Sequence, residues 1–375
     1  MQLLKLVQHQ IRLGAALPWN VRNENGKLLL AQGQLVADEG QLEALLDRGA
    51  FVDVEEVRAA RKAEAAAAAA TTAQATIFSM WEAALWRLDR VLRSAGLEPG
   101  FPQRVDELAR YLVALAERDG DIGIFVAVRQ EQKRFNVYAL AHALHTSMTC
   151  FLMARRLGWP ADRVLVLTKA ALTMNIATLD LQGRLAAQGV PPTAKQLDLI
   201  RAHPTQGEAI LRDAGVDDPA WLAAVAQHHE RQGGAGYPLG LNEVDEMACA
   251  LRHADVFMAK ISPRAVRPAL PTQAAARQLF QEDKGGPMAM AIIKEFGIYP
   301  PGDFVQIKSG ELAVVVRRGT NANAPMVACI TDRAGIPVVT SVRRDTAKPE
   351  FAIVASPADK SLVLRIQPEQ LYGLV

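Results

Sequence analysis

The chain has few cysteines, few histidines and almost no net charge. Cys150, Cys249 and Cys329 are its 3 cysteines, and they are far apart. An odd and widely spaced set argues against a disulfide framework and favours the reducing cytoplasm. Lys and Arg number 42 against 40 Asp and Glu, so the formal net charge is only +2. Bulk electrostatics therefore indicates neither a nucleic-acid partner nor a membrane surface.

Long apolar runs are also absent from the sequence. The first residues, Met-Gln-Leu-Leu-Lys-Leu-Val-Gln-His, lack the apolar stretch of a signal peptide. We find no uninterrupted apolar run that approaches the length needed to span a bilayer. We therefore expect no membrane span.

What the sequence does contain is a concentration of histidines. Of the 7 histidines, His203, His228, His229 and His253 fall in the tract that ends at Asp255. Neutral imidazoles beside a carboxylate are the usual ligands of Zn²⁺ and other transition metals. A glycine-rich loop directly follows the histidine pair, and residues without a Cβ let the backbone approach a ligand closely.

The arrangement His-His-Glu-Arg, then Gly-x-Gly-Tyr-Pro and a later Asp, resembles the HD-GYP family of metal-dependent phosphohydrolases. Those enzymes hydrolyse the bacterial second messenger cyclic di-GMP. The resemblance implies that His142 is the first ligand, because His145 lies too close to Leu157-Gly158. It implies a single divalent metal ion (Fe, Mn or Zn), or none, at five ligand positions: His142, His203, His228, His229 and Asp255.

The chain departs from the family where the paired His and Asp should stand. Met174 replaces the His, Asn175 the Asp and Thr178 the Lys of that run. In the family the Asp bridges two metal ions and so lowers the pKa of a shared water. Asn175 has no negative charge, and a thioether at Met174 is a poor ligand for such ions. We interpret the chain as a degenerate member, although Met174 is equally typical of a buried residue that fills the volume of a lost site.

The resemblance also implies a set of ligand-binding residues. These are Gly236, Tyr237 and Pro238 of the glycine-rich loop and Arg264 and Arg267 after the last metal ligand. A guanidinium fork suits phosphate oxygens and keeps its charge at any physiological pH. A solvated cationic edge is the alternative interpretation of the two arginines. One departure is Gly233, which stands where the family usually has Asp.

Changes in hydrophobic period divide the chain into parts. We expect a small α+β module over 1–57, with a hairpin at Asn25-Gly26, and an Ala-rich linker and helix over 58–95. A degenerate HD-GYP helical domain should cover 96–298, and a β domain, a small sheet or barrel, should cover 299–375. The predicted fold is thus multidomain and mainly α, with an all-helical HD-type core between two small β-containing units.

Two functions remain open from the sequence. The first is a module of cyclic di-GMP signalling that responds to cyclic di-GMP or binds other signalling proteins, with little or no hydrolysis. The second is a metal-dependent cyclic di-GMP phosphodiesterase with residual activity from the remaining ligands. Met174 and Asn175 favour the first, because losing the bridging carboxylate removes transition-state stabilisation. The helix expected around Trp81 and Leu85 should pack on its own domain, and the alternative is that it forms a homodimer.

Overall fold

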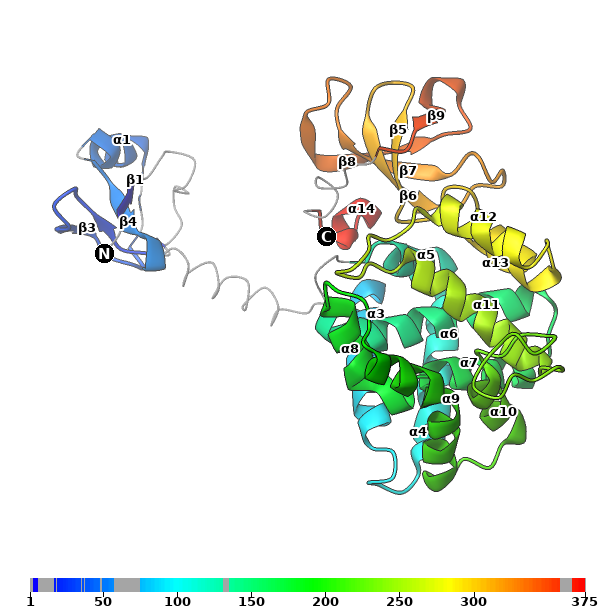
Figure 1. Ribbon diagram of the computed structural model, residues 1–375. Coiled ribbons are helices and arrows are strands. Elements are labelled where there is room, and N and C mark those ends of the chain that lie inside the picture. The colour runs from blue at the N-terminus through cyan, green and yellow to red at the C-terminus, as the bar shows by residue number, and fades with distance from the viewer. Residues whose placement is uncertain are drawn as a thin grey trace. The chain divides into compact units, whose positions relative to one another are not determined.

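The computed structural model describes residues 3–5, 17, 19–34, 36, 38–47, 49–56, 75–130, 135–357 and 366–374. The chain divides into two compact units, Met1–Gln74 and Ala75–Val375 (Figure 1). The Ala-rich run predicted from residue 58 to 74 lies outside the described residues. The domain limits proposed from the sequence stay predictions.

The N-terminal unit is the expected small α+β module. Its strands are β1 (Leu3–Lys5), β2 (Val21–Arg22), β3 (Leu28–Leu30) and β4 (Phe51–Asp53), with helix α1 (Glu39–Asp47) before β4. They pair antiparallel in the order β1-β4-β2-β3. Gly26 has φ 77° in the β2–β3 turn, a conformation that glycine adopts without a steric penalty. The pairing of β2 with β3 follows from this turn.

The second unit begins with a helical part that confirms the predicted all-helical core. Its α-helices are α3 (Ile77–Arg93), α4 (Phe101–Arg118), α5 (Gly120–Val128), α6 (Tyr138–Arg156), α7 (Ala161–Thr173), α8 (Leu179–Ala187), α9 (Ala194–Asp213), α10 (Pro219–Gln227), α11 (Glu246–Ile261), α12 (Thr272–Glu282) and α13 (Pro287–Phe296). Short 3₁₀ turns, η2 (Phe135–Val137) and η3 (Ile176–Thr178), precede α6 and α8. Helix α3 packs into the same apolar core as α4, α5 and α6.

Helix α6 is the central element of this helical part. Almost all of its residues from Tyr138 to Ala154 are buried, and it contacts α3, α7, α8, α11 and α13. A helix that is covered on every face is a core helix. It carries His142, so this histidine is held by packing on all sides.

The chain then forms an antiparallel sheet in the order β8-β7-β6-β5-β9 (Figure 1). Its elements are β5 (Phe304–Ile307), β6 (Leu312–Arg317), β7 (Met326–Thr331), β8 (Pro337–Asp345), a 3₁₀ turn η4 (Pro349–Phe351) and β9 (Ile353–Ala355), and helix α14 (Pro368–Tyr372) follows. Side chains alternate between its two faces, as the period of a strand requires. Val314, Val316, Ala328 and Ile330 join the core of the helices.

Polar contacts also attach the sheet to the helices. Arg318, just after β6, donates from Nη1 to Glu295 Oε2 at 2.8 Å and to the Glu295 carbonyl at 2.7 Å. Glu295 also accepts from Arg156 Nε at 2.6 Å, and Arg318 pairs with Asp121. Tyr372 of α14 packs edge-on against Phe125 with ring centroids 5.3 Å apart. The helices and the sheet therefore share one folded unit.

The stretch Ala161–Ala187 is long and apolar enough to span a membrane by length and composition. The stretch is not an uninterrupted apolar run, because it contains Lys169 and Asp180. The stretch forms α7, η3 and α8, and 67% of its most apolar 18-residue window is buried inside the protein. Core helices of soluble proteins have the same composition, because they too are surrounded by apolar side chains.

Candidate metal centre

Three of the histidines singled out from the sequence form a tight cluster. His203 lies on α9, and His228 and His229 directly follow α10. One ligand atom from each lies within 4.8 Å of the other two. Helices α9 and α10 pack against each other, which brings the two parts of the motif together.

The hydrogen bonds of this cluster fix which nitrogen carries the proton. His203 Nδ1 lies 2.5 Å from the carbonyl oxygen of Ile200, and His228 Nδ1 lies 2.7 Å from that of Val225. A carbonyl oxygen can only accept, so both Nδ1 atoms carry hydrogen. In the neutral rings both Nε2 atoms then hold lone pairs. These two Nε2 atoms face each other at 3.1 Å.

Burial keeps the three rings neutral. Desolvation lowers the pKa of His203 to about 4, and the charge of His228 adds to this effect. Burial also lowers the pKa of His228, and that of His229 lies well below its usual value for the same reason. Neutral imidazole is the form that binds a metal ion.

The cluster therefore fits a divalent transition metal. Two lone pairs at 3.1 Å repel each other unless a cation or a proton lies between them. The lowered pKa values disfavour the proton. Metal-bound histidines usually donate their other N–H to a carbonyl, as His203 and His228 do here. An ion about 2.0–2.1 Å from each nitrogen can be bound by both, because their separation is less than twice that bond length.

His142 and Asp255, the other two predicted ligands, bind each other. His142 Nε2 donates to Asp255 Oδ1 at 2.7 Å, and both residues are buried. They come from α6 and α11, which pack together. This bond uses one nitrogen of His142, whose buried Nδ1 has no hydrogen-bond partner among the described residues.

Electrostatics connects this pair to the cluster. Burial alone would raise the pKa of Asp255, but the hydrogen bond and the charge of His142 hold this pKa well below its usual range. The Asp255 charge in turn acts on His203, His228 and His229. All five residues therefore belong to one electrostatic environment.

The glycine-rich loop is held by Glu230, which is 1% exposed. Its Oε1 accepts from the amides of Leu239 at 2.6 Å and Gly240 at 3.2 Å, and its Oε2 accepts from Leu241 at 3.1 Å. The loop packs so closely that a Cβ on Gly236 would lie 2.4 Å from the Glu230 Cα. Only glycine fits there.

Tyr237 of this loop completes the wall of the cluster. Its ring stacks on His229 with centroids 4.6 Å apart and an interplanar angle of 26°. The peptide bond before Pro238 is cis. Glu230 therefore acts on the histidines through the loop, because it fixes the backbone that presents Tyr237.

Arg264 and Arg267 lie beside the His142–Asp255 pair. Arg264 Nε donates to the Tyr138 hydroxyl at 2.9 Å, and the Tyr138 ring stacks on His142 with centroids 5.8 Å apart. The Arg264 amide donates to the Arg267 carbonyl at 3.1 Å, so the two arginines come from one short turn. Burial and the nearby charge of Arg264 lower the pKa of Arg267.

The run that replaces the His-Asp pair is buried. Met174 is 0% exposed and Asn175 is 4% exposed, between α7 and η3. The Asn175 carbonyl accepts from the Thr178 amide at 2.9 Å. This run packs on α9, where a Cβ on Gly207, one turn after His203, would lie 3.6 Å from the Met174 carbonyl.

Sequence analysis missed the roles of Glu230 and Tyr138. Glu230 follows the histidine pair directly, so it is part of the motif, but nothing in its position indicates three backbone partners. Tyr138 lies one helical turn before His142, and that spacing could have predicted contact between them. His253 is a structural histidine that lies between the Cys249 carbonyl and Asp283.

The chain has relatives among known proteins. No family model matches the chain. A cyclic di-GMP phosphodiesterase of Pseudomonas aeruginosa is 26% identical over 216 residues, 56% of this chain and 52% of that protein. A 3′3′-cGAMP-specific phosphodiesterase of Vibrio cholerae is 30% identical over 142 residues, 37% of this chain and 30% of that protein. The chain thus spans about half the length of the first of these relatives and less of the second.

A solved structure supports the fold. An HDG"Y"P protein from Bdellovibrio bacteriovorus matches with a TM-score of 0.50 and 18% identity, over 78% of this chain and 99% of that one. At this identity the likeness shows the fold alone. The matched relatives supply the sequence evidence and the three-histidine cluster the local geometry. The chain is thus similar in sequence to two cyclic-dinucleotide phosphodiesterases and similar in fold to an HD-GYP protein.

Proposed function

We propose that this protein is a metal-binding receptor for a cyclic dinucleotide, with little or no hydrolytic activity. The observation that carries the proposal is the coexistence of an ordered histidine cluster with Met174 and Asn175 in place of the His-Asp pair. The cluster retains the means to bind a metal. The substitutions remove the carboxylate that would hold two ions around one hydroxide.

Metal binding rests on the three histidines, with His142 and Asp255 next to them. The bound ion would supply positive charge for a phosphate oxygen of the ligand. Imidazole suits several transition metals, so iron, manganese and zinc are the candidates. The Nε2 atoms of His203 and His228 are available to the ion, because each ring donates its Nδ1 proton to a carbonyl.

Arg264 and Arg267 are the proposed phosphate-binding residues. Among the described residues, neither forms an ion pair with a carboxylate, although both are partly buried. Two adjacent guanidinium groups with no anionic partner favour a bound anion. The interpretation as a solvated edge fits less well, because Arg264 is positioned by the Tyr138 hydroxyl and Arg267 donates to the Ala259 carbonyl at 2.5 Å.

The nature of the ligand is inferred from the relatives. Their names specify cyclic di-GMP for one and 3′3′-cGAMP for the other. Both are cyclic dinucleotides with two phosphates, which matches a site that combines a cation position with two arginines. Binding of other signalling proteins and a homodimer remain predictions.

The alternative function is residual hydrolysis of the same ligand. It is favoured by the five remaining ligand residues, His142, His203, His228, His229 and Asp255. It is disfavoured by the neutral side chain at Asn175 and by Thr178, which offers no cation to the phosphate.

The test combines metal analysis with ligand titration. Purified protein loaded with Mn²⁺, Fe²⁺ or Zn²⁺ should bind cyclic di-GMP or 3′3′-cGAMP in calorimetry and release no linear dinucleotide. Arg264→Ala and Arg267→Ala should weaken binding at least about tenfold, since hydrogen bonds to charged groups contribute roughly 1.5–3 kcal/mol. Arg277→Ala, at an exposed position on α12, is the matched control. Metal-dependent turnover abolished by His228→Ala would overturn the proposal in favour of the phosphodiesterase.

A further inference from the structure

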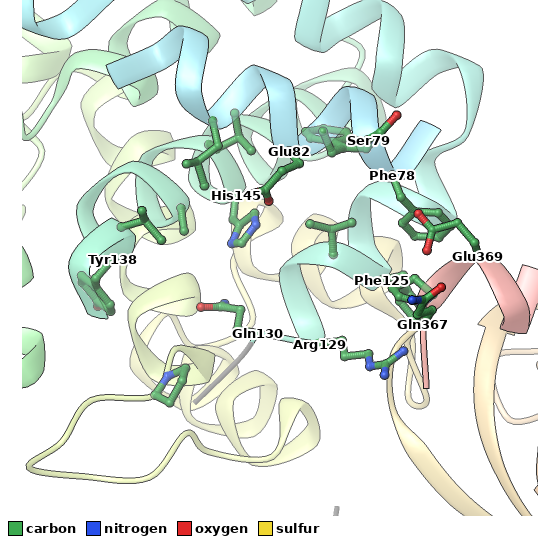
Figure 2. A pocket seen from close by; sticks show the side chains of 18 of the residues that line it. Phe78, Ser79, Glu82, Phe125, Arg129, Gln130, Tyr138, His145, Gln367 and Glu369 are labelled. Atoms are coloured by element: carbon green, nitrogen blue, oxygen red, sulfur yellow. The ribbon is translucent and has the colours of Figure 1, made fainter. Parts of the chain in front are cut away.

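A pocket of about 520 Å³ lies apart from the histidine cluster (Figure 2). Its walls come from α3, α5, the first turns of α6 and residues 366–369 before and in α14. None of the five predicted metal ligands lines it. Its volume is in the range of pockets that bind small organic molecules.

Aromatic side chains form part of the pocket wall. Phe78, Trp81, Phe125 and Tyr138 line it, and Phe78 and Phe125 pack edge to face with centroids 5.7 Å apart. Rings held in this way present flat surfaces that do not collapse onto each other. A planar ligand can therefore be covered on its faces at little cost in reorganisation.

His145 gives this apolar pocket a polar group that lacks a partner. Its ring points into the pocket between Glu82 and Gln130 (Figure 2). The side chain is 5% exposed, and its Nδ1 is buried with no hydrogen-bond partner among the described residues. Burial, with the charge of His142, lowers the pKa of His145 to about 3, so the ring is neutral and can donate through one nitrogen and accept through the other.

An unpartnered buried ring nitrogen is costly unless something binds it. His253 provides the contrast, because its two nitrogens contact the Cys249 carbonyl at 2.6 Å and Asp283 at 2.9 Å. His145 differs from it in having a pocket where those partners would be.

We propose that this pocket binds an uncharged, planar aromatic or heteroaromatic small molecule whose polar atom pairs with His145. A charged group placed against Trp81, Leu85 and Leu144 of the wall would lose its solvation, which favours an uncharged ligand. At the rim, Glu369 already accepts from the Thr76 hydroxyl at 3.3 Å. The site requires no metal, so it stands or falls independently of the proposed cyclic dinucleotide function.

Indole and benzothiophene are the matched probes, since they have similar size and only indole has an N–H. Ligand-observed NMR and calorimetry in the presence of EDTA should detect indole binding to the full chain. The His145→Leu variant should weaken indole binding about 3- to 10-fold, the effect of one hydrogen bond. Binding of benzothiophene should change by less than about twofold.

A second variant blocks the pocket without removing a polar group. Ala141→Phe, on the pocket wall, should abolish binding of both probes, whereas Ala83→Phe, exposed on α3 outside the pocket, should not. Failure of the wild-type chain to bind indole at 1 mM overturns the proposal. It is equally overturned if Ala141→Phe binds as well as Ala83→Phe, or if His145→Leu keeps the wild-type preference for indole over benzothiophene.

Discussion

Glu230 should be the main residue that stabilises the conformation of the glycine-rich loop. We predict that Glu230→Ala destabilises the protein and exposes the loop amides, although Glu230 is not a proposed metal ligand. The carboxylate accepts three backbone hydrogen bonds, from Leu239, Gly240 and Leu241. Hydrogen bonds to a charged group are worth roughly 1.5–3 kcal/mol each, so three of them would contribute about 4.5–9 kcal/mol at most.

The expected loss is smaller than this limit, because water can replace part of the carboxylate at a half-exposed loop. Leu239, for example, is 64% exposed. We expect Glu230→Ala to lower the free energy of unfolding by about 3–5 kcal/mol, at the high end of single substitutions. Glu230→Gln should lose about 1–3 kcal/mol, because one oxygen becomes an NH₂ group that cannot accept from a backbone amide.

Urea unfolding followed by circular dichroism measures the free energies, and hydrogen exchange reports on the amides of Leu239, Gly240 and Leu241. Glu243→Ala, exposed in the same loop, is the control. The reasoning is refuted if Glu230→Ala lies within about 0.5 kcal/mol of that control, or if the three amides keep their protection.

Three further results are expected. The unmodified protein should hydrolyse cyclic di-GMP negligibly with Mn²⁺ or Fe²⁺, while Met174→His with Asn175→Asp should raise the bound metal per chain, measured by mass spectrometry, more than either change alone. Gly236→Ala should destabilise far more than Gly233→Ala in urea unfolding, because its Cβ would meet backbone atoms at 2.4 Å whereas Gly233 has only its φ of 81° against it. Lowering the pH from 7 to 5 should reduce the free energy of unfolding by about 2 kcal/mol through His145, because the pKa of this histidine is 6.5 in the unfolded chain and about 3 in the folded chain. Urea unfolding at both pH values measures this loss, and the same loss in His145→Leu would contradict the prediction.

The fold was predictable where the signals are local. The turn at Asn25-Gly26 and the short strands after Tyr299 follow from residue type and hydrophobic period. The docking of α3 was not predictable in this way. Phe78 contacts Phe125 of α5 and Tyr372 near the C-terminus, and no local pattern specifies partners so far apart in the chain.

The residues of the site could be predicted from the sequence, but the contacts between them could not. The motif indicated the histidines, yet whether His203 faces His228 or Asp255 depends on how the helices pack. The role of Glu230 as an acceptor for three amides depends on the loop conformation, which exists only in the folded chain. The pocket at His145 depends on residues 366–369, which sequence analysis assigned to a separate β domain.

Because the helices and the sheet share one core, the smallest fragment that we expect to fold alone contains both. A fragment ended at residue 298 would leave the faces that cover Val314 and Ile330 open to water, and Glu295 would lose Arg318. Such a fragment should aggregate rather than fold. Grafting the histidine cluster into a chimera therefore requires residues 75–375 as a block. Any rearrangement that separates the helices from the sheet must also replace an apolar surface.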